Sequence, residues 1–205
     1  MRGLLLLGAL LMASCGGPPA HGTFSALTAN AGDAGALCAH QVPAEACTRC
    51  EPSRAASFKK VGDWCGPHEV PESQCHACHP DLSFEPLPEA PPGADQRAVP
   101  REVALTGLAG ATAPGKVTVV DFWAVWCVPC RRTAGELNLR LAHDPGLAVR
   151  KIQVADWDDP LAVKYLAGTP ELPLLVVFDA QGAEVGRVKG HRPAELDALL
   201  AKARQ

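Results

Sequence analysis

Two cysteines, Cys127 and Cys130, stand in the sequence WCVPC directly after the apolar run VTVVDFWAV. The run is β-branched and aromatic, which predicts a buried strand at residues 117–123, and residues 129–143 have helical periodicity. A helix N-terminus carries partial positive charge and free N–H groups, so it stabilises a thiolate in its first turn. We therefore predict a reversible dithiol–disulfide pair in which Cys127 is the nucleophile and Cys130 resolves the mixed disulfide.

The elements that must position this pair follow in the C-terminal half, residues 100–205. We expect a strand at 147–154, a short helix at 160–166 and a closing helix that begins at Pro193. Two further strands, 174–178 and 185–188, flank a Gln-Gly turn signal and form a hairpin. This alternation predicts an α/β domain with a mixed sheet.

The stretch VTVVDFWAVWCVPCRRTAGEL resembles the active-site segment of the thioredoxin family, and the elements after it agree. The resemblance implies a thioredoxin-like fold, a mixed central sheet flanked by helices, and protein-disulfide oxidoreductase activity that needs no cofactor in this domain. Val128 and Pro129 between the cysteines resemble reducing members of the family more than strong oxidants. The alternative for the CxxC pair alone is a zinc site shared with a second pair, in which Trp126 and Pro129 would have no role.

The resemblance also assigns roles outside the dithiol. Asp121 matches the family's buried aspartate, which assists proton transfer to and from the resolving cysteine, and Lys151 is either that aspartate's buried neighbour or a solvated lysine. Pro173, rather than Pro170, matches the cis-proline whose preceding backbone groups pair with a substrate strand. The residues implied in substrate binding are Trp126, Pro129, Leu172 and Pro173.

A second constellation lies upstream, where the sequences CAHQVPAEACTRC and CGPHEVPESQCHACH repeat with a period of 28 residues. Each unit offers three cysteines and one histidine, a ligand set suited to a tetrahedral Zn²⁺ or to Cu(I). The segment is also similar to Cys/His repeats attached to some bacterial heavy-metal efflux adaptors. The expected ligands are Cys38, His40, Cys47 and Cys50 in one unit and Cys65, His68, Cys75 and Cys78 in the other.

Two other uses of these six cysteines stay open. In an oxidising exported compartment they can pair as three disulfides. The sequence CHACH at residues 75–79 also satisfies the attachment pattern of a c-type haem. Because the segment is poor in large apolar residues, a metal or cross-links must stabilise any fold it adopts.

The N-terminus reads MRGLLLLGALLMASC, a short charged start followed by an apolar stretch too short to span a bilayer. Its end, Met12-Ala13-Ser14-Cys15, resembles the lipobox of bacterial lipoproteins, in which the cysteine carries the lipid. The alternative is an ordinary signal peptide cut nearby. Either interpretation predicts export, and the first predicts a membrane-anchored lipoprotein that faces the periplasm or the cell surface.

The chain therefore divides into a signal peptide at residues 1–14, a tether at 15–36, the Cys/His segment at 37–80, a Pro- and acid-rich linker at 81–99 and the redox domain at 100–205. A net charge of −3 without a basic block argues against nucleic acid as a partner. The expected partners are protein thiols and disulfides, a membrane or periplasmic electron donor, and the membrane itself. Two functions follow: a thiol–disulfide oxidoreductase, or a Zn or Cu binding or delivery protein whose redox domain maintains the metal-binding thiols.

Overall fold

The computed structural model of the chain describes residues 36–168 and 170–205. The expected signal peptide, the lipidation site Cys15 and the tether up to residue 35 lie outside the described residues. Within the described part, no helix has both the length and the apolar character that crossing a membrane requires.

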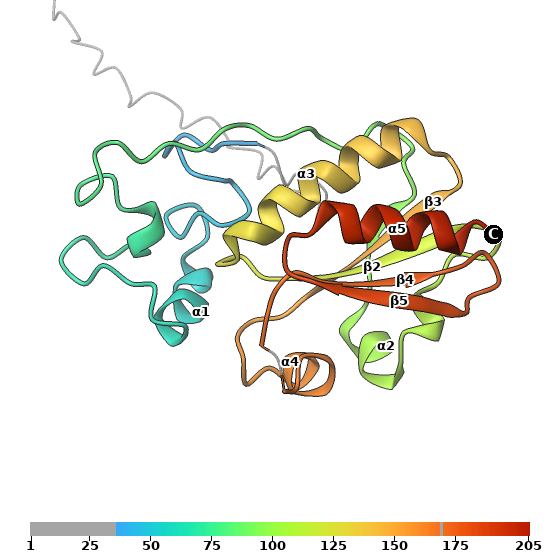
Figure 1. Ribbon diagram of the computed structural model, residues 1–205. Coiled ribbons are helices and arrows are strands. Elements are labelled where there is room, and N and C mark those ends of the chain that lie inside the picture. The colour runs from blue at the N-terminus through green and yellow to red at the C-terminus, as the bar shows by residue number, and fades with distance from the viewer. Residues whose placement is uncertain (1–35, 169) are drawn as a thin grey trace, which may run out of the picture.

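The C-terminal domain is built on one five-stranded mixed sheet in the order β1-β3-β2-β4-β5 (Figure 1). The central strand β2 runs parallel to β3, and β3 runs parallel to β1, whereas β4 is antiparallel to both β2 and β5. The α/β fold with a mixed sheet is therefore confirmed. The strands are β1 (Gln96–Ala98), β2 (Val117–Trp123), β3 (Leu147–Gln153), β4 (Leu174–Phe178) and β5 (Glu184–Lys189).

Helices cover both faces of this sheet, as the layers in Figure 1 show. One face carries α3 (Val128–His143) and α5 (Pro193–Ala203), and the other carries α2 (Arg101–Thr106) and α4 (Pro160–Tyr165). Two apolar clusters fill the layers: Leu137, Leu141, Leu196 and Leu200 pack on the α3 side, and Ala104, Leu161 and Phe122 pack on the other. The sheet thus lies between the two helical layers.

The alternation of side chains along β2 decides which residues face α3. Val119 belongs to the cluster on the α3 side, whereas Val120 and Phe122 belong to the opposite cluster. Because successive strand residues point to opposite faces, Asp121 shares the face of Val119 and lies beneath α3. The sequence therefore places a carboxylate in the layer that also receives the inner side of that helix.

The Cys/His segment is mostly irregular, as expected. Its regular structure is limited to α1 (Ala55–Lys60) and to 3₁₀ turns at Pro52–Arg54 and Glu72–Gln74. A further 3₁₀ turn, Ala109–Ala111, follows α2. In Figure 1 the segment lies beside the N-terminal end of α3, and the chain after it runs over that helix.

The stretch expected to be only a linker, residues 81–99, differs from that expectation. Leu87 and Pro88 pack against Gly135 of α3, and the side-chain amide of Asn138 donates a hydrogen bond to the Pro88 carbonyl at 2.9 Å. The stretch also contains β1, which pairs with β3 at the edge of the sheet. A three-residue edge strand is too short to leave a periodic pattern in the sequence, and the same holds for the six-residue helix α2.

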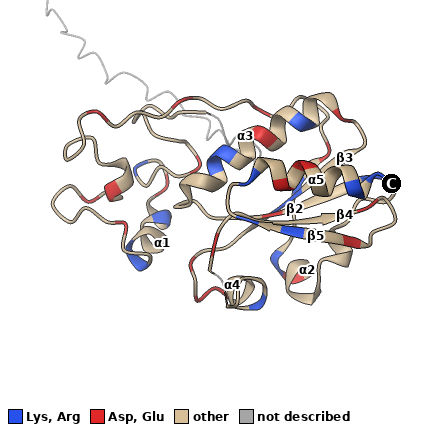
Figure 2. Cartoon of the chain, in the orientation of Figure 1, with Lys and Arg blue, Asp and Glu red and all other residues tan. Residues whose placement is uncertain are grey.

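Charged residues of both signs are interspersed over the described chain, as Figure 2 shows. Several of these pairs join separate elements: Arg101 of α2 meets Asp159, the capping residue of α4, and Arg140 of α3 meets Asp197 of α5. The Arg140–Asp197 pair is exposed and contributes little stability by itself, whereas Asp159 is buried and also accepts backbone hydrogen bonds from Ala155 and Leu161.

We expect Leu137→Ala to destabilise the protein by about 2–5 kcal/mol, because it empties a buried position between α3 and the sheet. The matched control is Leu139→Ala on the same helix, where the leucine is 49% exposed and the cost should stay within about 0.5 kcal/mol. Chemical denaturation followed by far-UV circular dichroism measures both values. Equal losses in the two variants would contradict this assignment of the inner face of α3.

Candidate functional site

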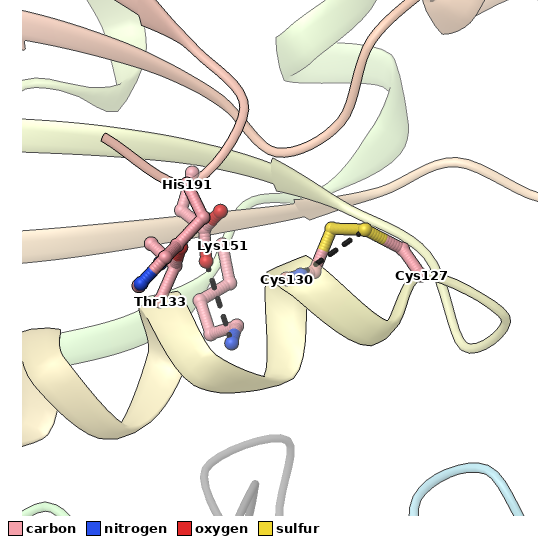
Figure 3. The surroundings of a disulfide bond; sticks show 6 residues. Cys127, Cys130, Thr133, Lys151 and His191 are labelled. Carbon is pink, nitrogen blue, oxygen red and sulfur yellow. Dashed lines mark hydrogen bonds and ion pairs between the residues drawn. A yellow bond between two sulfur atoms is a disulfide. The ribbon is translucent and has the colours of Figure 1, made fainter. Parts of the chain in front are cut away.

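Cys127 and Cys130 are joined by a disulfide at the start of α3 (Figure 3). Cys127 occupies the N-cap position in an extended conformation, and its Sγ accepts a hydrogen bond from the backbone N–H of Cys130 at 3.2 Å. Cys130 lies one turn into the helix and is 2% exposed, against 8% for Cys127. The cap thus directs free N–H groups and the positive end of α3 at the more accessible sulfur, which favours a thiolate there when the pair is reduced.

An apolar rim surrounds the disulfide. Val128 and Pro129 are exposed in the first turn of α3, where a proline removes no helical hydrogen bond. The indole Nε1 of Trp126 donates a hydrogen bond to the carbonyl of Ala155 at 2.8 Å, and the ring meets Trp157 edge-on. These contacts fix the loop before Cys127 to the loop after β3.

The turn before β4 contributes the second wall of the site. Leu172 packs in the same apolar cluster as Cys127 and Cys130, and the Leu172–Pro173 peptide bond is cis. The carbonyl of Pro173 accepts a hydrogen bond from the backbone N–H of Gly190 at 2.8 Å. Among the described residues, the backbone N–H and carbonyl of Leu172 have no hydrogen-bond partner, so they are available to an extended peptide.

Asp121 and Lys151 form a buried charged pair beneath α3. They are register partners on the parallel strands β2 and β3, and the Lys151 Nζ lies 3.5 Å from an Asp121 Oδ. Both side chains are buried, and neither carboxylate oxygen of Asp121 has a hydrogen-bond partner in the described structure. Burial raises the pKa of Asp121 above its ordinary value, although the nearby Lys151 opposes the rise. Figure 3 shows Lys151 beneath the helical turn between Cys130 and Thr133.

The family model for thioredoxin matches residues 111–202 of this chain. Thioredoxin from Echinococcus granulosus is 32% identical over 103 residues, which cover 50% of this chain and 92% of that protein. The chain belongs to the thioredoxin family. Thioredoxin from Staphylococcus aureus is 39% identical over 80 residues, which cover 38% of this chain and 73% of that protein. Thioredoxin f from spinach chloroplast is similar in structure, with a TM-score of 0.44, 20% identity and coverage of 55% of this chain and 96% of that one.

The family model matches residues 111–202, so the Cys/His segment at residues 37–80 lies outside the matched region. Within the thioredoxin domain, the structure also reveals a contact that the sequence analysis missed. The Thr133 hydroxyl and the His191 Nδ1 are 3.0 Å apart (Figure 3). The His191 Nε2 lies 3.3 Å from a Glu136 Oε. His191 thereby ties the loop after β5 to α3, one turn beyond Cys130, and no residue pattern in the sequence marks it.

The structure brings the eight expected metal ligands together in two separate groups, which we call cluster 1 (Cys38, His40, Cys47 and Cys50) and cluster 2 (Cys65, His68, Cys75 and Cys78). In each cluster the three Sγ atoms and one imidazole nitrogen lie within 4.8 Å of one another. All six cysteines are unpaired thiols. Three thiols and an imidazole around one centre are the donors that Zn²⁺ and Cu(I) prefer, so both clusters fit such an ion.

The Cys/His segment contacts the thioredoxin domain on two sides of the active site. Lys60 of α1 forms ion pairs with Asp156 and Asp158, at 3.0 and 3.2 Å, in the loop that carries Trp157. On the other side, an Oε of Glu45 lies 3.8 Å from the Nε of Arg131, the residue after Cys130. Burial raises the pKa of Glu45 to about 7, although Arg131 and Lys151 oppose the rise. The segment therefore lies next to the redox site rather than apart from it.

We predict that Asp121→Asn changes the pH dependence of stability in a defined direction. Because the folded pKa of Asp121 is raised, the wild-type protein loses stability as pH rises from the unfolded value of about 4 to the folded value. The asparagine side chain does not titrate, so the stability of the variant relative to wild type increases over this interval, by at most about 1.4 kcal/mol per pH unit. Urea denaturation at a series of pH values measures the difference.

A matched control variant should show the opposite pH trend in stability relative to wild type. Burial alone would raise the pKa of Asp95, but Arg150 and Lys116 outweigh it and hold that pKa below its ordinary value. Asp95→Asn should therefore lose stability relative to wild type as pH rises from the depressed folded pKa to about 5. Two variants with the same pH trend would contradict the burial argument for Asp121.

Proposed function

We propose that this chain is an exported, lipid-anchored thiol–disulfide oxidoreductase that acts on protein disulfides through Cys127 and Cys130. The observation that carries the proposal is the disulfide at the N-terminus of α3, with Cys127 as the capping residue and the more exposed sulfur. Membership of the thioredoxin family, whose members are thiol–disulfide oxidoreductases, supports the same reaction class.

In the reduced protein the Cys127 thiolate attacks one sulfur of a substrate disulfide. A bond forms between Cys127 Sγ and that sulfur, the substrate S–S bond breaks, and the other substrate sulfur leaves as a thiolate. The N-terminal end of α3 lowers the energy of the attacking thiolate, because its N–H groups and partial positive charge face Cys127. The product of this step is a mixed disulfide between Cys127 and the substrate.

Cys130 then resolves the mixed disulfide. Its thiol must lose a proton in a buried position, and the carboxylate of Asp121, buried beneath α3 with a raised pKa, would accept that proton. The Cys130 thiolate attacks Cys127 Sγ, the protein disulfide forms, and the second substrate thiolate leaves. Two electrons pass from the protein dithiol to the substrate disulfide, so each further turnover requires an external donor of two electrons.

The surroundings of the disulfide favour an extended protein substrate over a small molecule. The backbone of Leu172 offers one free donor and one free acceptor, which suit a peptide in strand conformation. Trp126, Val128 and Pro129 offer apolar surface on the other side of the sulfurs. Leu172 and Pro173 would therefore align the substrate backbone while the rim contacts its side chains.

Export and anchoring rest on the sequence of the first 15 residues alone. The apolar stretch and the Met12-Ala13-Ser14-Cys15 motif support cleavage before Cys15 and lipidation of that cysteine. One acyl chain binds a membrane only weakly, so stable anchoring requires more than one. The redox domain would then act at a membrane surface, where a membrane or periplasmic electron donor can reduce it.

Metal handling by the Cys/His segment is the second candidate function. The specific observation in its favour is that six unpaired thiols and two imidazoles gather in two clusters beside the redox site. In a delivery protein the thioredoxin domain would keep these thiols reduced, and bound metal would pass readily to an acceptor. Metal that stays bound in the presence of a competing acceptor would argue against delivery.

We predict that Cys127→Ser reduces insulin-disulfide reduction to the level of a Cys127→Ser/Cys130→Ser double variant. The double variant serves as the control because it retains the six thiols of the Cys/His segment. Cys130→Ser should instead accumulate mixed disulfides with substrate proteins, visible on non-reducing gels and released by dithiothreitol. A Cys127→Ser protein with near-normal activity would show that another cysteine is the nucleophile.

We also predict that the mature protein, isolated from membranes of a bacterial host with a lipoprotein pathway, begins at Cys15 and carries acyl chains. Intact-mass and peptide mass spectrometry measure both properties. Cys15→Ala should move the protein to the soluble fraction, whereas Cys38→Ala should leave it in the membrane. An unmodified N-terminus at another residue would contradict lipidation.

A further inference from the structure

We propose that clusters 1 and 2 each bind one zinc ion, and that the two ions are structural sites that hold residues 37–80 beside the redox disulfide. The proposal goes beyond the oxidoreductase function and does not depend on it, since it concerns cysteines that take no part in thiol–disulfide exchange at Cys127 and Cys130. The proposal rests on the arrangement of the ligand atoms within each cluster.

Interatomic distances within the clusters match tetrahedral zinc. Bonds of about 2.3 Å to sulfur and 2.0–2.1 Å to nitrogen place tetrahedral ligands about 3.8 Å apart for two sulfurs and about 3.5 Å apart for sulfur and nitrogen. The His40 Nδ1 lies 3.8, 3.5 and 3.3 Å from the three Sγ atoms of cluster 1. The His68 Nδ1 lies 3.3, 3.4 and 3.4 Å from those of cluster 2, where the Cys65 Sγ is 3.6 Å from both other sulfurs.

The backbone around the two clusters repeats with the same 28-residue period as the sequence. The hydrogen bond from Ala46 N to Pro43 O recurs from Gln74 N to Pro71 O. Similarly, Glu51 N to Cys47 O recurs as His79 N to Cys75 O. The chain therefore contains the same ligand-presenting unit twice, and the residues that both units keep include three of the four ligands at equivalent positions.

One backbone conformation that both units share is energetically unfavourable, and it occurs directly after the histidine ligand in each. Gln41 and Glu69, which are equivalent positions, both adopt the left-handed conformation with φ of 60° and 52°. Non-glycine residues rarely adopt this conformation, because their Cβ crowds the backbone. In both units the turn directly follows the histidine ligand and directs it toward the thiols, so the unfavourable conformation serves the geometry of the cluster.

Disulfide bonding fits these clusters less well than metal binding. Each cluster contains three cysteines, an odd number, so pairing within a cluster always leaves one thiol over. Three disulfides would require a bond between the clusters and would break both ligand sets. In the same chain, Cys127 and Cys130 are joined by a disulfide, and this group consists of two thiols alone.

A haem or an exchangeable delivery site also fits poorly. Cys75 and Cys78 of the haem-like sequence point to His68 and Cys65, whereas the His79 side chain pairs with Glu72 at 2.9 Å. Four protein ligands close a zinc coordination sphere, which is typical of structural rather than catalytic or transfer sites. The clusters therefore favour tightly held metal.

The Cys/His segment has too small an apolar core to be stable without bound metal or cross-links. Apart from the prolines Pro43 and Pro71, residues 36–80 bury only seven apolar residues, three of which are the cluster cysteines Cys47, Cys65 and Cys75. Phe58 is the one large side chain among them, and the two units meet through a hydrogen bond from Gln74 Nε2 to the Ala46 carbonyl at 2.9 Å. Segments of this length rarely fold without metals or cross-links, so bound zinc would supply the missing free energy.

The experiment measures metal in the full chain, purified without an affinity tag under reducing conditions from zinc-supplemented cells. Inductively coupled plasma mass spectrometry should find two zinc ions per chain, one for each cluster. X-ray absorption at the zinc edge should give a shell of three sulfurs and one nitrogen, with zinc–sulfur distances of about 2.3 Å. This second measurement needs no variant, so it tests the proposal even where a substitution prevents folding.

Ligand variants and matched controls then locate the ions. Cys47→Ser with Cys50→Ser should lower the content to one zinc, and Cys75→Ser with Cys78→Ser should do the same. The controls Glu51→Gln and His79→Gln occupy equivalent positions directly after the last ligand of each unit, and both should retain two. A chelator should expose residues 37–80 to protease while the thioredoxin domain stays intact.

Four results would overturn the proposal. One is a reduced chain without bound metal, and another is an exported protein whose six cysteines all occur as disulfides by mass spectrometry. The third is Cu(I) rather than zinc in both clusters, which would overturn the assignment of the ion. Unchanged zinc content in both ligand double variants would likewise show that the metal lies elsewhere.

Discussion

The junction between β2 and α3 is the constraint on which the rest of the structure depends. The chain must leave a buried strand, turn within a few residues and start a helix with Cys127 as its cap, so that the helix N-terminus and both sulfurs meet at one point. This geometry holds only because α3 is fixed along its length by Leu137 and Leu141 against the sheet. The reactivity of one sulfur is therefore determined by the packing of a sixteen-residue helix.

The buried pair of Asp121 and Lys151 lies in the same layer, between the sheet and α3. Parallel pairing of β2 and β3 makes the two residues register partners, and strand alternation directs both beneath α3. A carboxylate without hydrogen bonds in this layer reduces stability when ionised, since the nearby ammonium at 3.5 Å compensates only part of the lost hydration. In the proposed mechanism the same cost would favour a protonated Asp121, the form that can return a proton to the dithiol. Stability and the proposed function would then make opposite demands on one side chain.

Much of this arrangement was predictable because its signals are local. The β-branched run before Cys127, the periodic residues of α3 and the Gln-Gly turn predict elements whose bounds agree within one or two residues with β2, α3, β4 and β5. The burial of Asp121 follows from its place in an apolar run. Contacts between distant segments leave no such signal: Lys60 with Asp156, Glu45 with Arg131, and Leu87 with Gly135 each depend on how the Cys/His segment and the linker lie against the thioredoxin domain. The short elements β1 and α2 were missed because they carry too few residues for periodicity.

The chain keeps two kinds of cysteine chemistry apart by geometry rather than by composition. Among the described residues, Cys127 and Cys130 have no third thiol or histidine in their group, so oxidation closes them into one bond that exchange can reopen. The other six are arranged in threes around an imidazole, where a zinc ion would take up the thiolates and leave none free to attack the neighbouring disulfide. Because the segment borders the redox site on the sides of Asp156 and Arg131, unprotected thiols there would be potential substrates of their own domain. Metal coordination would therefore give the segment its fold and would also prevent its cysteines from competing with the substrate.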